Sequence, residues 1–159
     1  MSKHPQLDIR RAGPADVAAV RSLTRDAYAK WIAVIGREPL PMKADYEKAV
    51  REHEIDLLYA DGDLVALIEV IPTADHLFIE NIAVSPEQQG KGLGRHLVRL
   101  AEARAKCAGL GELRLLTNEA FATNVRLYQS IGFRIDRTEP HFGGGTTVYM
   151  SKHLAGGES

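Results

Sequence analysis

The chain has 159 residues, of which 45% are hydrophobic and 26% are charged, so it is long enough to bury about 70% of its unfolded surface in one core. Its 14 Gly and 7 Pro residues are too few for a low-complexity chain. Its longest apolar runs, residues 31–35 and 64–68, contain five residues each, whereas a membrane span needs about 20. These numbers exclude a wholly disordered chain and a membrane-spanning one.

Charge and cysteine content narrow the class of protein further. The 20 Lys and Arg residues against 21 Asp and Glu give a net charge of −1, whereas a general nucleic-acid-binding protein is more basic. Cys107 is the single cysteine, so no intrachain disulfide can form, and the first residues lack the apolar stretch of a signal peptide. We therefore expect a cytoplasmic protein that binds neither nucleic acid nor membrane.

The first quarter of the chain predicts one short strand followed by helices. Residues 7–10 alternate between apolar and polar side chains, as in a strand. Pro14 suits the first turn of a helix and Asp16 suits its positive dipole. Apolar residues then recur at helical spacing until Gly36 and two nearby prolines end the helix. A second, shorter helix is expected at about residues 44–53.

The middle of the chain predicts a hairpin, a strand and a long helix. Residues 55–59 and 64–71 are apolar runs on either side of Asp61-Gly62, a pair that accepts the positive φ angles of a tight hairpin. Residues 77–84 form the next predicted strand. Residues 91–108 carry a leucine-rich stripe at helical spacing, and Gly109 is suited to end that helix.

The last third predicts a strand at residues 112–117, a helix at 122–131 and two strands near 133–138 and 146–151. The tail, residues 155–159, is expected to be flexible. No internal repeat or long linker interrupts this order. Residues 1–159 therefore predict a single α/β domain with its core at about residues 7–154.

The segment 88–95, Gln-Gln-Gly-Lys-Gly-Leu-Gly-Arg, lies between a predicted strand and a predicted helix. Its glycines let the backbone approach a ligand closely, and the free N–H groups of a first helical turn favour phosphate oxygens. The Walker pattern is absent, and a dinucleotide fingerprint starting at Gly90 would need Gly where Arg95 stands. From these residues alone, an anion-binding loop and a simple helix cap both stay open.

Three segments in the right order resemble the GNAT superfamily of N-acetyltransferases, in its bacterial single-domain type. Gln89-x-x-Gly92-x-Gly94, following the strand at 78–84, resembles motif A, residues 127–133 resemble the end of motif B, and residues 148–154 resemble the final strand. The resemblance covers most of residues 7–154. It implies an α/β (α+β) fold in which a mixed, mostly antiparallel sheet of about six to seven strands is flanked by about four helices and splayed between the fourth and fifth strands.

The resemblance also implies acetyl-CoA as the cofactor and assigns residues to it. Many family members have an asparagine seven residues before the motif B tyrosine; here that position is Phe121, and Asn118 and Asn124 are both open as substitutes. The expected cofactor contacts are the backbones of Ile82, Ala83 and Val84, the loop residues Gln89, Gly90, Lys91, Gly92, Leu93, Gly94 and Arg95, one of the asparagines Asn118 and Asn124, and Tyr128.

The implied reaction is direct attack of a primary amine on the acetyl thioester, which needs a base and an acid. Tyr128 matches the motif B tyrosine and is the expected acid. Glu80 is the expected base, because strand alternation would put it on the face of Ile82 and Val84, where desolvation raises a carboxyl pKa. Without the resemblance, Tyr128 would be read as a core aromatic and Glu80 as a solvent-facing or ion-paired residue.

The acceptor site in this family is formed by the first helices and the loop before the last strand. Here these are residues 28–46 and 139–145, and they suggest Tyr28, Arg37, Glu38 and Phe142 as contacts with a small-molecule or peptide amine. The six histidines show no metal-binding spacing, so no metal is expected. A non-catalytic module that binds coenzyme A, a transferase for another acyl group, and a homodimer all stay open as alternatives.

Overall fold

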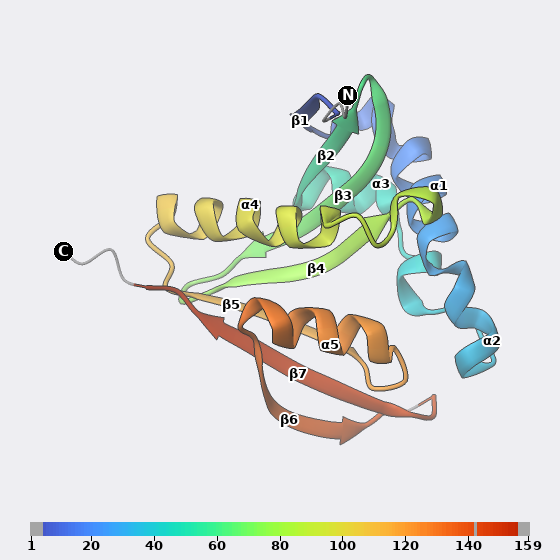
Figure 1. The fold of residues 1–159 in the computed structure, drawn as a ribbon, viewed down its shortest axis with the longest axis vertical. Helices are drawn as coiled ribbons and strands as arrows, with labels where there is room; N and C mark the ends of the chain where they lie inside the picture. Colours follow the sequence, from blue (N-terminus) through green and yellow to red (C-terminus); the bar gives the residue numbers. More distant parts are fainter. Residues whose placement is uncertain (1–4, 142, 156–159) are drawn as a thin grey trace, which may run out of the picture.

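The computed structural model describes residues 5–141 and 143–155 of the chain (Figure 1). In this part, seven strands form one sheet in the order β1-β2-β3-β4-β5-β7-β6. All neighbouring strands are antiparallel except β4 and β5, which are parallel. The strands are β1 (Leu7–Arg11), β2 (Glu54–Ala60), β3 (Asp63–Pro72), β4 (Leu77–Val84), β5 (Glu112–Asn118), β6 (Arg134–Pro140) and β7 (Thr146–His153). The predicted mixed, mostly antiparallel sheet is confirmed.

The helices follow the predicted order, with one difference in the first long helix. The α-helices are α1 (Val17–Tyr28), α2 (Ile32–Ile35), α3 (Tyr46–Glu52), α4 (Leu93–Cys107) and α5 (Ala122–Ile131), and the 3₁₀ turns are η1 (Pro14–Asp16), η2 (Ala29–Trp31), η3 (Leu40–Lys43) and η4 (Pro86–Gln88). The expected continuous helix up to Gly36 is divided by the tighter turn η2, because apolar spacing alone does not separate α from 3₁₀ geometry. Beyond Ala155, the expected flexible tail lies outside the described residues.

The sheet is packed between two helical layers (Figure 1). On one face, α4 and α5 cover a core that includes Leu97, Leu113 and Tyr128. On the other face, α1 and α3 cover a second core that includes Val20 and Tyr46. Neighbouring residues of a strand serve opposite cores, as the two-residue period requires. Each fully buried aliphatic side chain contributes about 1.5–3 kcal/mol to this packing.

The hairpin between β2 and β3 turns at the predicted dipeptide. Asp61 has φ 51° and Gly62 has φ 87°, the pair of positive angles that matches the twist of a two-residue hairpin. Asp61 also accepts a hydrogen bond from the Gln6 backbone N–H at 3.0 Å, which ties the segment before β1 to the turn. The local sequence was therefore sufficient to predict this connection.

The sheet opens between β4 and β5. These strands pair only at Leu77 with Leu113 and at Phe78 with Arg114. In β4, the pairing with β3 passes from Ile79 directly to Asn81 and leaves Glu80 without a partner. Such a bulge bends a strand and increases its twist, so β4 turns away from β5 beyond this point. The predicted splay between the fourth and fifth strands is confirmed.

Candidate functional site

Two cavities lie beside the opening between β4 and β5. The first, of 490 Å³, lies between β4, α4, α5 and the end of α1, and the second, of 720 Å³, lies between α1, α3 and the other face of the sheet. Among the described residues, Tyr28 is the one that lines both. The two cavities therefore meet at the splay, so molecules bound on opposite faces of the sheet could react there.

The edge of β4 facing the first cavity has backbone groups that no strand uses. The Ser85 N–H donates to the Val65 carbonyl of β3 at 2.8 Å. Because hydrogen-bonded residues alternate along antiparallel strands, Ala83 also bonds to β3. Ile82 and Val84 therefore direct their backbone groups away from β3, toward the opening. The backbone of Ala83, which was expected to contact the cofactor, is therefore occupied by β3. The Ala83 side chain is buried in the second core. Ile82 and Val84 keep the predicted position.

Glycines shape the loop between β4 and α4. Gly90 has φ 83° and Gly92, at the N-cap of α4, has φ 86°, and a Cβ at either position would meet nothing within 4 Å. Both residues line the first cavity, so the backbone there is open to a ligand at a helix N-terminus, where anions are favoured. Gly94 has another role, since its Cβ would lie 3.2 Å from Leu127 of α5.

We expect Gly92→Ala to lower the free energy of unfolding by about 1 kcal/mol. A side chain in the left-handed region costs about 1–2 kcal/mol in the folded state, and the lower conformational entropy of the unfolded alanine chain offsets part of this cost. Gly111→Ala is the matched control, since its φ is not positive and its Cβ would also meet nothing within 4 Å. Urea denaturation measures both. Equal effects of the two substitutions would contradict a strained N-cap.

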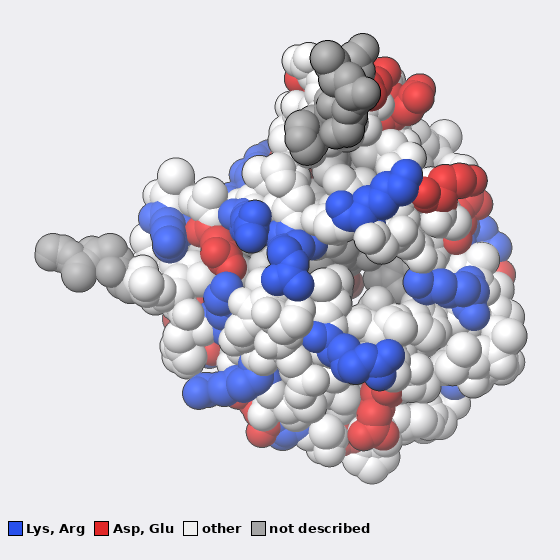
Figure 2. All heavy atoms as spheres, in the orientation of Figure 1, with Lys and Arg blue, Asp and Glu red and all other residues white. Residues whose placement is uncertain are grey.

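Side chains near the loop supply positive charge and fix its position. Figure 2 shows the α4/α5 face, with blue Lys and Arg side chains around a hollow near its centre. Arg95 and Lys30 line the first cavity, whereas Lys91 is exposed and lies between Gly90 and Gly92, which line it. Gln89 accepts a hydrogen bond from Lys30 at 2.7 Å and donates to the Val84 carbonyl at 2.9 Å.

The sequence interpretation missed Lys30. Its partner Gln89 lies 59 positions away along the chain, so no local pattern joins the two residues. The Lys30 Nζ also lies 5.0 Å from the centre of the Trp31 ring. Partial burial lowers the pKa of Lys30. Only the packing of η2 against the glycine loop brings this charge to the cavity.

Tyr128 and Asn124, on successive turns of α5, line the first cavity. The Tyr128 ring packs edge-on against Phe133, and burial raises the Tyr128 pKa to about 12, so its hydroxyl stays protonated at neutral pH. Asn118 lines the second cavity instead, and its side-chain oxygen accepts a hydrogen bond from the Ala120 N–H at 2.8 Å. Of the two asparagines, Asn124 is the one beside the glycine loop.

Glu80 lies at the second cavity, on a different face from the one expected. The bulge puts Glu80 and Asn81 on the same side of β4, where both line the second cavity, whereas Ile82 and Val84 line the first. Simple alternation was therefore wrong here, because one extra residue reverses the faces beyond it. Desolvation first, and then the Glu69 carboxylate, raises the pKa of Glu80.

A buried carboxylate that the sequence interpretation missed lies next to Glu80. Glu69, in β3, is 3% exposed, and its Oε2 lies 2.6 Å from Nδ1 of His53. Burial raises the pKa of Glu69, and the His53 contact partly opposes that shift. Its sequence signal is a lone acid in the otherwise apolar segment 64–71. Glu69, Glu80 and His53 all line the second cavity, and the two carboxylates make this part of its wall acidic.

Two of the four expected acceptor contacts line the second cavity, Tyr28 and Arg37. The Tyr28 hydroxyl donates to Asn81 Oδ1 at 3.0 Å, and the Asn81 amide in turn donates to the Tyr46 hydroxyl at 3.3 Å, so the residue between the cavities is held in place. Glu38 instead pairs with Arg25 at 2.9 Å, and the structure does not bring it to the lining of the cavity. Phe142 lies outside the described residues.

Residues 5–141 and 143–155 contain neither a metal-binding cluster nor a membrane-spanning helix. No group of three or more His, Cys, Asp or Glu side chains there is arranged to hold a metal ion. In the same part of the chain, every helix is too short or too polar to cross a membrane.

Relatives and solved structures resemble this chain. A streptothricin acetyltransferase of Streptomyces lavendulae is 40% identical over 76 residues, which cover 46% of this chain and only 40% of that protein. The L-methionine sulfoximine/L-methionine sulfone acetyltransferase of Pseudomonas aeruginosa is 25% identical over 149 residues, covering 85% and 84%. The PaiA N-acetyltransferase of Thermoplasma acidophilum, solved in complex with coenzyme A, has the same fold with a TM-score of 0.80, 20% identity and coverage of 94% and 99%.

The family itself is shown by the sequence model of the acetyltransferase (GNAT) family, which matches residues 18–133. That span includes α1, the splayed strand β4, the glycine loop and α5. The match thus covers the elements that build both cavities and confirms the resemblance read from the motifs. This chain belongs to the acetyltransferase (GNAT) family.

Proposed function

We propose that this protein is an acetyl-CoA-dependent N-acetyltransferase that acetylates a primary amine of a small molecule or peptide by direct attack. The observation that carries the proposal is the meeting of the two cavities at Tyr28. One cavity has an open strand edge and a glycine loop at a helix N-terminus, and the other has an acidic part of its wall. The named relatives are acetyltransferases of different small molecules, which supports the class of reaction.

The residues of the first cavity fit coenzyme A. The N–H groups at the start of α4 suit a pyrophosphate, and Lys30 and Arg95 add positive charge at the same cavity. The backbone N–H groups of Ile82 and Val84, which no strand uses, suit the carbonyl groups of the pantetheine arm and its thioester, in the way that an added strand binds a sheet edge. When bound, acetyl-CoA supplies the acetyl thioester. The Val84 N–H, which is directed toward the opening, would serve as a preorganised donor to the thioester carbonyl.

On the acceptor side, Glu80 removes a proton from the incoming ammonium group. The free amine then forms the C–N bond while the C–S bond breaks. The second proton of the nitrogen passes through solvent to the leaving thiolate, so the products are the amide and the free thiol of coenzyme A. A carboxylate whose pKa is raised toward neutrality is a stronger base than an ordinary one, and Glu80 has this property. It lies at the cavity opposite the glycine loop, so the amine approaches the thioester from the other face of the sheet.

Tyr128 stabilises the leaving sulfur by donating a hydrogen bond. Its pKa of about 12 exceeds the value of about 8.5 for a thiol. Complete proton transfer to the thiolate would therefore be uphill by about 5 kcal/mol. A neutral hydroxyl that donates to a developing negative charge avoids this cost. The expected acid is thus better described as a hydrogen-bond donor that stays protonated.

Binding of the donor tests the first half of the proposal. Acetyl-CoA at about 100 times its dissociation constant should add about 2.7 kcal/mol to the free energy of unfolding by mass action, which thermal melting detects. A panel of amines monitored by release of free thiol tests the second half. No melting shift would contradict coenzyme A binding. A shift without thiol release from any amine would support a non-catalytic binding module instead.

A further inference from the structure

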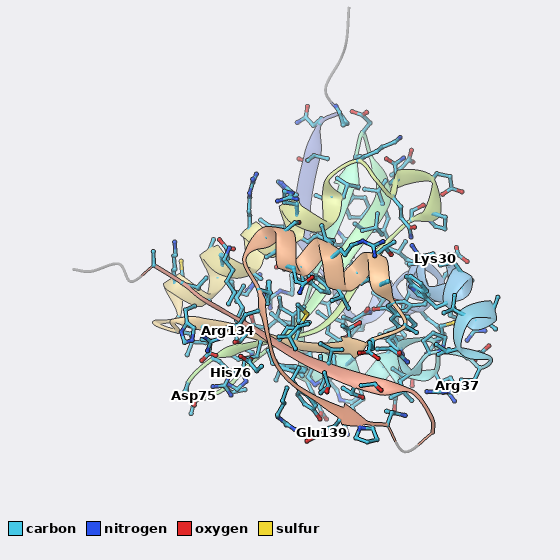
Figure 3. The ribbon with its side chains drawn as sticks, turned by 60° about the horizontal axis from the view of Figure 1, so that its bottom comes forward. Lys30, Arg37, Asp75, His76, Arg134 and Glu139 are labelled. Carbon is cyan, nitrogen blue, oxygen red and sulfur yellow. The ribbon has the colours of Figure 1, made fainter. Side chains whose placement is uncertain are left out.

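The charged groups that line the second cavity are divided between its walls. Glu69 and Glu80 come from the adjacent strands β3 and β4, and His53 follows α3. Arg37 comes from the segment after α2, and Figure 3 shows it beside the turn that joins β6 and β7. The lining also includes the apolar side chains of Phe78 and Phe121, and the charged residues Lys43, Asp45, Lys48 and Glu52 from η3, the loop after it and α3. The sheet wall of the cavity thus carries two carboxylates, and Arg37 lies on a different wall.

The positive charge of Arg37 is not matched by a carboxylate of the described residues. Its neighbour in sequence, Glu38, is bound by Arg25 at 2.9 Å. The Arg37 guanidinium instead donates to the Gly144 carbonyl at 3.2 Å, which fixes its position but leaves its charge in place. A partly buried guanidinium with donors in a planar fork is suited to a carboxylate. This wall of the cavity therefore favours an anionic group.

The sheet wall favours a cation. Glu69 is buried beside His53, and Glu80 is adjacent in β4 to Asn81, the residue that pairs with Glu69 across the sheet. Two nearby carboxylates repel each other unless a positive group comes between them. Since the acyl acceptor enters with its nitrogen protonated, this wall matches an ammonium group.

We propose that the acceptor is an amine that carries a carboxylate, with its ammonium group at Glu69 and Glu80 and its carboxylate at Arg37. The substrate class is thus a zwitterion, either a free amino acid or a short peptide with a free C-terminus. The inference rests on the proposed acetyltransferase function and names the substrate class of its acceptor site. The volume of 720 Å³ leaves room for a spacer between the two charges.

Matched pairs of amines test the proposal through release of free thiol from acetyl-CoA. One series consists of glycine, β-alanine, 4-aminobutyrate and 6-aminohexanoate, each compared with its carboxamide, and a second consists of di- and tripeptides compared with their C-terminal amides. At least one carboxylate should exceed its amide about tenfold or more in kcat/KM. The length that works best separates a free amino acid from a peptide as the source of the carboxylate.

Substitution of Arg37 separates recognition from a general loss of activity. Arg37→Gln should lower kcat/KM for the preferred carboxylate by about 10- to 100-fold and change the value for its amide little, and Arg37→Lys should restore part of the loss. Arg99→Gln is the control, since Arg99 is exposed on α4 and lines neither cavity. The melting shift with acetyl-CoA reports that each variant is folded.

Each other outcome has a distinct meaning. Equal rates for acids and amides in the wild-type protein, or equal losses for both in Arg37→Gln, would overturn the zwitterion while leaving the acetyltransferase intact. Thiol release from no amine at all would overturn the proposed function, and the substrate class with it.

Discussion

Replacing Tyr128 by Phe should slow acetyl transfer by about 10²- to 10³-fold, the loss expected when one preorganised donor to a developing negative charge is removed. Coenzyme A binding should change little, because the glycine loop and the edge of β4 are untouched. Burial raises the Tyr128 pKa to about 12, so the wild-type rate should show no loss from ionisation of this tyrosine near neutral pH. Single-turnover kinetics with saturating acetyl-CoA measures the effect.

A matched tyrosine controls for the loss of a hydroxyl in general. Tyr149 donates to Glu139 at 2.9 Å and lines neither cavity, so Tyr149→Phe should leave the single-turnover rate within about twofold of the wild type, the change that a surface substitution of about 0.5 kcal/mol would give. An unchanged rate in Tyr128→Phe would remove this residue from the chemical step and leave it as part of the core.

Replacing Glu80 by Gln should lower kcat/KM by about 10²- to 10⁴-fold, the usual contribution of a positioned base. The carboxylate form is the active one. Because desolvation and Glu69 raise the Glu80 pKa, the wild-type rate should rise with pH through a value above that of an ordinary glutamate, and protonation should abolish it below. The pH profile of kcat/KM in Glu80→Gln should lack this rise.

Two further variants test whether Glu80 is the group that causes the rise. Glu69→Gln removes the like charge beside Glu80, so the rise should move to lower pH, and the kcat/KM plateau should fall only by the share of ammonium binding that Glu69 supplies. Glu47→Gln is the control, since Glu47 is exposed on α3 and lines neither cavity. A rise that persists in Glu80→Gln would assign the titration to another group, such as the substrate amine.

The site combines groups that the fold separates and then brings to one opening. Tyr128 belongs to the cavity under α4 and α5, whereas Glu80 belongs to the cavity under α1 and α3. Tyr28 lies between them, and its pKa is raised by burial first and then by neighbouring acidic groups, Tyr128, Glu69 and Glu80 among them. Donor and acceptor can therefore enter from opposite faces of the sheet, with proton-handling groups on each side.

Several features could be predicted from the sequence because each depends on residues close together in the chain. Asp61-Gly62 predicts a tight hairpin, since these two residues tolerate positive φ angles without tertiary support. The strand, glycine loop and helix around Gly92 are a contiguous unit, and the motif order made the family recognisable. The position of Tyr128 beside the loop followed from that order.

Other features were decided only by tertiary structure. The bulge in β4 has no marker in its apolar pattern, yet it moves Glu80 to the opposite face from Ile82. The pairing of Arg25 with Glu38, 13 positions apart, leaves Arg37 facing the cavity, and Lys30 meets Gln89 across 59 positions. Such contacts form when separate elements pack, because the partner of a long charged side chain depends on which surfaces meet. The local sequence and the order of its motifs thus determined the fold and the donor site, whereas tertiary packing determined which charged side chains face the acceptor.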